Sequence, residues 1–205
     1  MVFGSVVVLL AVSLPSLLNM PLNDADYAAV PYTKNGPVYI AHDIIVGTDG
    51  RPRKCTIVRT SGVANIDALT SASFMKRAKY KPARDDANQP VVGVIRMQSA
   101  WSRVGMPSRP PELADVSLKI KPVAGLNLPT TVGVFLTVDP LGQIVGCNAG
   151  PASKAVMLHR VACDQAKRLG PLPIIINDDG QPTLYVRSAA VNFATDPGIA
   201  ASSAH

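Results

Sequence analysis

A chain of 205 residues that is 47% hydrophobic can bury one mid-sized core or two small ones. Its net charge of +6 is uneven, because residues 34–103 carry twelve Lys and Arg against five acidic residues, whereas residues 104–205 carry eight against seven. The basic residues have few aromatic neighbours and no base-reading motif, which argues against nucleic-acid binding. A solvated face, or one that meets anionic lipid or an acidic partner, is the favoured interpretation.

The chain begins with an apolar segment. Residues 2–18 carry no charge, and the first Lys or Arg is Lys34. Such a run is typical of a secretory signal or a short membrane anchor, so residues 1–28 are interpreted as one of these. Either would place the protein in the periplasm or anchor it in the inner membrane, facing the periplasm, with residues 2–18 as the tether. A buried globular segment is the third interpretation, since seventeen residues are short for a membrane span.

Residues 34–103 predict a first module that opens with a β-hairpin. The stretch Val38–Val46 is rich in β-branched and apolar residues and ends at a tight turn that contains Asp49 and Gly50. A second strand is expected over residues 52–60, where Ser61 and Gly62 end it.

A helix and a third strand complete this module. Apolar residues at helical spacing predict a helix over residues 65–79, with basic residues at its C-terminal end and Pro82 as its stop. After a polar turn, residues 91–101 predict the last strand. The predicted order is strand, strand, helix, strand.

The second half predicts the same order. Residues 104–128 contain four prolines and predict a linker with one short structured piece. Strands are expected over 131–138, 143–149 and 183–193, and an amphipathic helix is expected over 158–169. The module spans residues 129–195, and residues 196–205 predict a disordered tail.

An internal repeat connects the two halves. Nine residues of the segment 37–101 are identical to the residues 92 positions later, without a gap. The matches fall largely on turns, strand ends and one cysteine, where backbone geometry restricts the choice. We therefore interpret the chain as two related modules of the α+β class. Each is expected to hold a three-stranded antiparallel sheet with one packed helix.

The three cysteines favour one disulfide. The repeat aligns Cys55 with Cys147, but only the second module has a cysteine at the helix position, Cys163, where the first has Ser71. If Cys147 ends a strand and Cys163 lies on the helix above it, they can be bridged, which leaves Cys55 free. Two buried thiols are the alternative, and a zinc site with His159 lacks enough ligands.

Catalytic motifs are absent from the sequence. The three His residues belong to no nucleophile and acid constellation, and His42 and Asp43 are expected on opposite faces of a strand. The acidic turn at residues 177–180 lacks the ligands of a calcium loop, so a plain turn is favoured. The sequence therefore predicts a protein that is not an enzyme and uses no metal or cofactor.

The first module resembles the C-terminal domain of the TonB energy transducers. The resemblance covers residues 37–101 and is weaker over 129–193. It rests on the hairpin turn, the Ser-Gly pair, and an aromatic residue followed by a proline: Asp49, Gly50, Ser61, Gly62, Tyr80 and Pro82. Similar members of this family often have one cysteine after the hairpin turn and another in the helix, and Cys147 and Cys163 match these two positions.

The resemblance implies binding without chemistry. In this family the domain receives an extended peptide of an outer-membrane receptor beside the last strand of its sheet, by β-strand addition. The corresponding edge here would consist of Val91, Val92, Val94, Ile95, Arg96, Met97 and Trp101. The implied partner is an envelope protein or outer-membrane receptor, and a link to TonB-dependent transport follows from the resemblance.

The chain departs from a complete energy transducer, because only about fifteen residues separate Leu18 from Lys34. We therefore expect a free or tethered envelope binding protein that does not transmit force. The alternative is a structural or self-associating module, with homo-oligomers, whose sheets join edge to edge and leave no edge free for a peptide.

Overall fold

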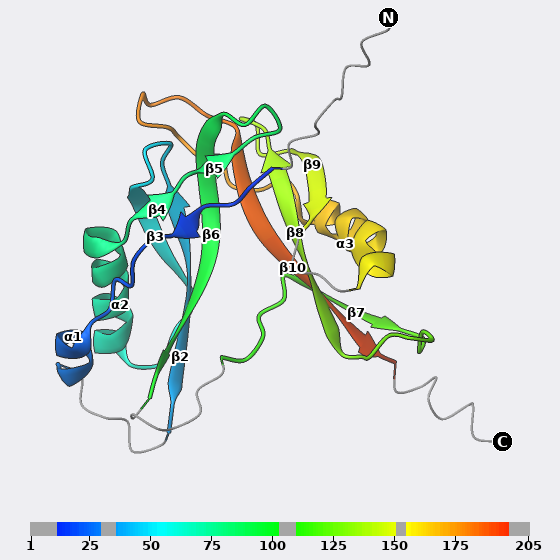
Figure 1. Ribbon diagram of the computed structural model, residues 1–205, viewed down its shortest axis with the longest axis horizontal. Helices are drawn as coiled ribbons and strands as arrows, with labels where there is room; N and C mark the ends of the chain where they lie inside the picture. Colours follow the sequence, from blue (N-terminus) through cyan, green and yellow to red (C-terminus); the bar gives the residue numbers. More distant parts are fainter. Residues whose placement is uncertain (1–11, 30–35, 103–109, 151–154, 197–205) are drawn as a thin grey trace, which may run out of the picture.

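The computed structural model describes residues 12–29, 36–102, 110–150 and 155–196. They form a mixed α/β fold in which one large multistranded sheet carries few helices (Figure 1). The strands of this sheet follow the order β3-β2-β6-β10-β8-β9, with β5 and β7 paired beside that path. The predicted tail, apart from Asp196, lies outside the described residues.

The first half places an antiparallel hairpin beside the last strand. The hairpin strands β2 (Val38–Val46) and β3 (Pro52–Arg59) pair with each other, and β2 also pairs antiparallel with β6 (Pro90–Trp101). Between them lie α2 (Ala64–Arg77) and two short strands, β4 (Tyr80–Lys81) and β5 (Ala83–Arg84). The short strands are additions that the sequence patterns did not predict.

The second half follows the same course along the sheet. Strand β8 (Thr130–Val138) lies between β9 (Ile144–Ala149) and β10 (Tyr185–Thr195), and both pairings are antiparallel. The expected helix consists of three pieces. They are the 3₁₀ turn η1 (Val156–Leu158), the α-helix α3 (His159–Ala166) and the 3₁₀ turn η2 (Lys167–Leu169).

The two halves share one sheet, which differs from the two separate three-stranded sheets expected from the sequence. Strands β6 and β10 pair in parallel, with Val92, Gly93 and Val94 opposite Tyr185, Val186 and Arg187. Val92 and Val94 are each 7% exposed. The physical reason is mutual burial, since two apolar edge strands cover each other's backbone and side chains.

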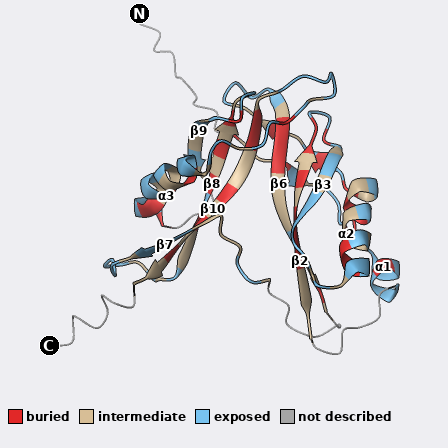
Figure 2. Cartoon of the chain, turned by 180° about the vertical axis from the view of Figure 1, so that it is seen from behind, coloured by how far each residue is buried: buried red, intermediate tan, exposed pale blue. Residues whose placement is uncertain are grey.

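The helices cover opposite faces of the sheet. Val92 and Val94 of β6 belong to the core that includes Ala162 of α3, whereas Ile95 and Met97 pack against the core that includes Phe74 of α2. Alternate residues of a strand point to opposite faces, so α2 and α3 lie on different sides. Buried residues accordingly line the strands under both helices (Figure 2).

The segment before β2 packs along the first half as a strap of residues 12–22, followed by α1 (Asp24–Ala28). Within the strap, β1 (Ser16–Leu17) pairs antiparallel with β4, and Ser13 and Arg84 exchange two backbone hydrogen bonds of 3.0 Å. Val12 packs with Ala83 and Val186. The described part of the apolar run, residues 12–18, thus packs on the first half, and residues 2–11 lie outside the described part.

No helix within the described ranges is long and apolar enough to cross a membrane.

The predicted linker, 104–128, contains a further strand, β7 (Val116–Ile120), which pairs in parallel with Val191–Thr195 of β10. Its residues alternate between half-buried and exposed, because one side of the strand packs against the core beside α3.

Candidate peptide-binding edge

The predicted peptide-binding edge is divided into a covered part and an open part. Val91 pairs with Ala83 of β5, and Val92 and Val94 lie in the parallel ladder with β10. The expectation of a free edge was therefore wrong for residues 91–94. The remaining predicted residues, Ile95, Arg96, Met97 and Trp101, lie where β6 has left β10, and no other described strand pairs with this side of β6.

Beyond Val94, β6 and β10 diverge and form a fork (Figure 1). On the β10 side of the fork, Asp115 and β7 take over the pairing that β6 has left. Among the described strands, the fork thus presents one edge without a pairing partner, residues 95–101 of β6, and the other side of this segment pairs with residues 38–44 of β2.

The hydrogen bonds of β10 show which residues of β6 direct their backbone N–H and C=O groups into the fork. The Asp115 N–H donates to the Ala190 carbonyl, and the Ala190 N–H donates to the Asp115 carboxylate, both at 2.8 Å, so Ala190 faces away from β8. The direction of the backbone groups alternates along a strand, so the N–H and C=O groups of Val186 point toward β6, where they lie between Val92 and Val94. The same alternation identifies the β6 residues whose backbone groups point into the fork: Arg96, Gln98 and Ala100.

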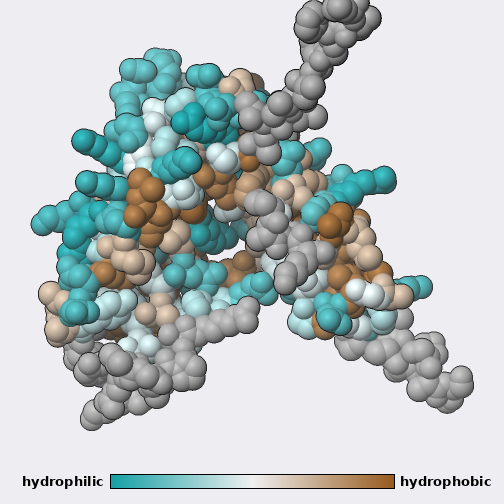
Figure 3. Space-filling view, viewed as in Figure 1, coloured by the Kyte–Doolittle hydropathy of each residue, from teal (hydrophilic) through white to brown (hydrophobic). Residues whose placement is uncertain are grey.

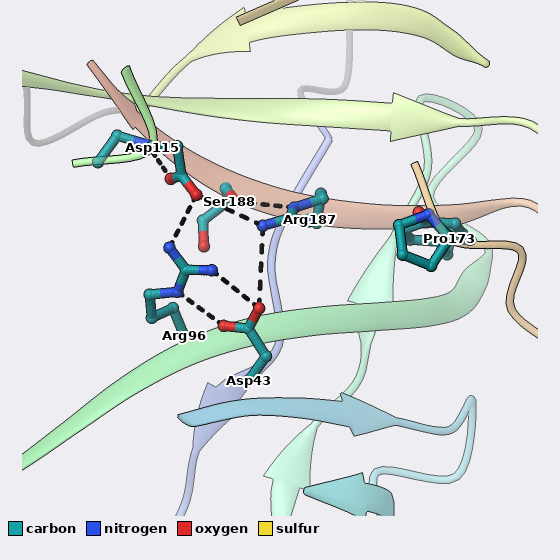
Figure 4. Close-up of polar contacts among 8 residues, drawn as sticks. Asp43, Arg96, Asp115, Pro173, Arg187 and Ser188 are labelled. Atoms are coloured by element: carbon teal, nitrogen blue, oxygen red, sulfur yellow. Dashed lines mark hydrogen bonds and ion pairs between the residues drawn. The ribbon is translucent and has the colours of Figure 1, made fainter. Parts of the chain in front are cut away.

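Four charged side chains close the apex of the fork (Figure 4). Arg96 donates to both carboxylate oxygens of Asp43, at 2.7 and 2.9 Å, and to Asp115 at 2.7 Å. Arg187 lies 3.9 Å from the Asp43 carboxylate and 3.8 Å from the Asp115 carboxylate. Hydrogen bonding to Asp43 raises the pKa of Arg96 above its ordinary value. The cluster is internally neutral, so Arg96 is not a free charge guarding the edge.

An open groove of about 730 Å³ accompanies this edge, lined by Arg96, Met97 and Gln98 of β6 and by Pro110, Pro111 and Glu112. The space-filling view shows the surface hollowed between the first and second halves (Figure 3). Pro110 and Pro111 have no backbone N–H and cannot extend the sheet as a regular strand would. The groove therefore lies beside strand groups that the facing segment does not pair.

Trp101 ends the edge as a buried anchor. Its indole N–H donates to the Thr70 hydroxyl at 3.1 Å, and its ring lies 4.7 Å from the ring of Tyr27. The side chain therefore stabilises the contact between β6, α2 and α1, and Ala100 is the last residue of β6 whose backbone groups point into the fork.

The predicted family-motif residues build the fold instead of lining the fork. Gly50 adopts a φ of 78°, and a Cβ there would lie 2.1 Å from the Tyr80 carbonyl oxygen. The Tyr80 N–H donates to the Gly50 carbonyl at 2.9 Å, and the Tyr80 ring is buried. Asp49 accepts from the Arg51 N–H at 2.9 Å, and Pro82 follows β4.

Ser61 and Gly62 shape the start of α2. The Ser61 N–H donates to Asp67 at 2.9 Å, and the Thr60 hydroxyl donates to the same carboxylate. Gly62 adopts a φ of 81°, which favours glycine. These residues fix the turn between β3 and α2, so their roles are structural.

The cysteines lie as the repeat suggested. The Sγ atoms of Cys147 and Cys163 are 2.01 Å apart, which joins β9 to α3. Cys55 is a free, half-buried thiol within hydrogen-bond reach of Ser71. Burial raises the pKa of Cys55, and the Ser71 hydrogen bond opposes this only in part. The thiol is therefore not an activated nucleophile.

The histidine that the sequence placed beside Asp43 is isolated in the core. His42 is fully buried against Phe74, with neither ring nitrogen hydrogen-bonded to a described residue. Burial lowers the pKa of His42 to about 4. The part of the chain that the structure describes contains no cluster of three or more His, Cys, Asp or Glu residues able to hold a metal.

Sequence reasoning missed the fork and its apex. Asp43 was considered only with His42, and Asp115 and Arg187 were assigned no role. One local signal was available for β7, because Val116, Leu118 and Ile120 alternate with polar residues in a period of two.

No family model, no curated protein and no solved structure matches this chain.

Proposed function

We propose that residues 37–101 and 129–193 are two related modules of the TonB C-terminal type, each with the order strand, strand, helix, strand. The strand registers support this. Ile44 pairs with Cys55 in one half, and Leu136 pairs with Cys147 in the other, which is the same pairing displaced by 92 residues. Val38 faces Trp101, and Thr130 faces Phe193, again at that displacement.

Turn geometry supports the same proposal. The polar turns before the last strands have matching backbone hydrogen bonds, from the Asp85 N–H to Gln89 and from the Asn177 N–H to Gln181. Asn88 and Gly180, 92 positions apart, both adopt a positive φ. Asn is one of the few residues besides Gly that tolerate this conformation, so the two turns adopt the same backbone conformation with different residues.

The activity we propose is capture of an extended peptide by β-strand addition at residues 95–101 of β6. The protein would be a non-enzymatic binding protein of the cell envelope. Its partner would be a segment of an envelope or outer-membrane protein, and it could serve TonB-dependent transport. The observation that carries the proposal is the side of β6 that no described strand pairs, which lies beside an open groove and where Arg96, Gln98 and Ala100 present backbone groups. An extended peptide satisfies such groups with its own main chain.

The apex chemistry limits which peptides suit the fork. Asp43, Arg96, Asp115 and Arg187 neutralise one another, so the apex offers no net charge to a ligand, and Glu112 is the charged side chain that lines the groove outside the apex. Main-chain pairing would supply most of the affinity, and Met97 would supply an apolar contact. We expect the preferred segments to be uncharged where they face the apex.

Hydrogen exchange tests this function directly. An array of extended peptides from envelope proteins is screened against the full chain, and the amides of Arg96, Gln98 and Ala100 are followed with and without a binding peptide. We expect these amides to exchange rapidly in the free protein and to be protected in the complex. Protection elsewhere, with these three amides unchanged, would contradict the proposed site.

A matched pair of variants completes the test. Gln98→Pro removes an N–H that points into the fork, whereas Gln98→Ala keeps the N–H and removes only an exposed side chain. We expect the Pro variant to bind the peptide roughly ten- to hundredfold more weakly, as the loss of a main-chain hydrogen bond implies, and the Ala variant to bind normally. Equal affinity of the two variants would argue against strand addition.

A second candidate function is that of a structural envelope module. The parallel joint between β6 and β10 favours it, because Val92 and Val94 are buried there by the chain's own second half. On this alternative the fork is closed by residues 110–115 and receives no peptide. Failure of every peptide in the array to protect β6 would favour this function.

A further inference from the structure

Strand β9 is the edge of the sheet at its second-half end, and it carries no charged residue. Its sequence from Ile144 to Ala149 pairs only with β8 among the described strands. The edge at the opposite end, β3, carries Arg53, Lys54 and Arg59. Charged side chains on an edge strand prevent unwanted pairing with other chains, so charge guards β3, whereas β9 has only the β-bulge that both hairpins share.

The outward side of β9 presents backbone donors and acceptors. The Gly150 N–H donates to the Gly133 carbonyl of β8 at 2.8 Å, so the backbone groups of Gly150 point inward. Because this direction alternates, Ala149 and Cys147 turn their N–H and C=O groups away from β8. No hydrogen bond joins these outward groups to another described residue.

The β9 edge is also held in place and apolar. Its bond to Cys163 attaches Cys147 to α3, so the strand is fixed on the helix as well as on β8. Val145 is 60% exposed, which leaves a large apolar side chain on the strand without a covering partner. A preformed edge of this kind pairs with little loss of conformational freedom.

We propose that β9 is the contact surface between two copies of this chain, which pair β9 against β9 in antiparallel orientation across a two-fold axis. An uncharged strand can face its own copy without repulsion, whereas pairing β3 with β3 would oppose two basic strands. Pairing β3 with β9 would not close and would produce open-ended chains. With Cys147 at the axis, Asn148 of each copy lies opposite Gly146 of the other, and Val145, the extra residue of the β-bulge, lies beside Ala149 of the other copy.

This surface is independent of the fork, because β10 and β8 lie between β9 and β6. The dimer would continue one sheet through both copies, with both forks left uncovered by the contact. The occupant is a second copy because it brings a strand of equal length and equal lack of charge.

Sedimentation of the full chain over a range of concentrations tests the proposal. We expect a dimer whose dissociation constant rises at least tenfold in Val145→Lys and in Asn148→Lys, two substitutions at exposed positions of β9. The matched control is Val58→Lys, at a 44% exposed position on β3, which should leave the dimer intact. Thermal unfolding and thiol counting on each variant verify that the fold and the disulfide persist.

A second measurement gives the site of contact. Amide exchange of Cys147 and Ala149 should slow as concentration rises through the dissociation constant, and that of β3 should not change. A monomer at all concentrations, assemblies larger than a dimer, or equal weakening by Val58→Lys would each overturn the proposal.

Discussion

Gly50 and Gly142 meet the same steric limit in the two halves of the chain. Each has a positive φ, 78° and 81°, and a Cβ would lie 2.1 Å from the Tyr80 carbonyl oxygen in the first half and 2.2 Å from that of Leu172 in the second. Each glycine carbonyl also accepts a hydrogen bond from the residue whose carbonyl it approaches, at 2.9 and 2.8 Å. The hairpin turn and the segment after the helix are therefore locked together without room for a side chain.

We predict that Gly50→Ala and Gly142→Ala each destabilise the protein by about 3 kcal/mol or more, because a left-handed conformation is costly for Ala and the new methyl group meets backbone. The control is Gly180→Ala, which has a φ of 79° but no atom within 4 Å of the added Cβ. It should cost only about 1–2 kcal/mol. Urea unfolding measures all three, and equal losses would show that the close approach does not matter.

Ser71→Cys should create a second disulfide. Ser71 lies 92 residues before Cys163 and is hydrogen-bonded to Cys55, the counterpart of Cys147. A closed loop of this size stabilises a protein by about 3 kcal/mol in the chain-entropy model. Labelling under denaturing, non-reducing conditions should count one thiol in the natural chain and in Ser71→Ala, and none in Ser71→Cys. Two labelled thiols in Ser71→Cys would contradict the equivalence of these positions.

Stability should fall in mild acid because of His42. Burial lowers its pKa to about 4, while the unfolded chain has the ordinary value, so the unfolded state binds more protons between these pH values. The stabilisation is present above about pH 6.5 and declines toward pH 4, by up to about 3 kcal/mol. The free energy of unfolding is measured at several pH values for the natural chain and for His42→Leu. The difference between the two pH profiles separates the contribution of His42 from that of the carboxylates. Parallel pH profiles of the two proteins would refute it.

The two arginines at the fork apex should differ in importance. Arg96 makes three hydrogen bonds of 2.7 to 2.9 Å, whereas Arg187 approaches the same carboxylates only at 3.8 and 3.9 Å. We expect Arg96→Met to cost about 2–3 kcal/mol, since it leaves two partly buried carboxylates poorly paired, and Arg187→Met to cost under about 1 kcal/mol. Chemical denaturation tests the ranking, and a larger loss for Arg187→Met would reverse it.

Local elements were predictable from the sequence because their signals are local. The apolar run that ends before the Gly50 turn predicted β2, and β3 and α2 followed from the turn residues and the helical spacing. The repeat directed attention to Cys147 and Cys163 because it compares positions directly. The strands and the helix depend on residues close together in the sequence, and the disulfide prediction depends on comparing positions 92 residues apart.

Long-range pairings could not be predicted in this way. Nothing near Val92 indicates that Tyr185 will lie beside it, because a parallel pairing has no turn to mark it. The apolar run of residues 2–18 has the same composition whether a lipid bilayer or a protein surface covers it, so composition alone leaves an export signal and a buried segment both open. The fork apex could not be predicted for the same reason, because Arg96 joins Asp43 of β2 to Asp115, which lies within the predicted linker.

The strap also determines when the chain can finish folding during synthesis. Val12 is synthesised 174 residues before Val186, with which it packs. Contacts so distant in sequence close slowly, and the apolar start of the chain has to wait for them. The contact of Val12 with Val186 is therefore completed only after translation has passed Val186, so the strap becomes fully packed later than the hairpin of β2 and β3 beside it.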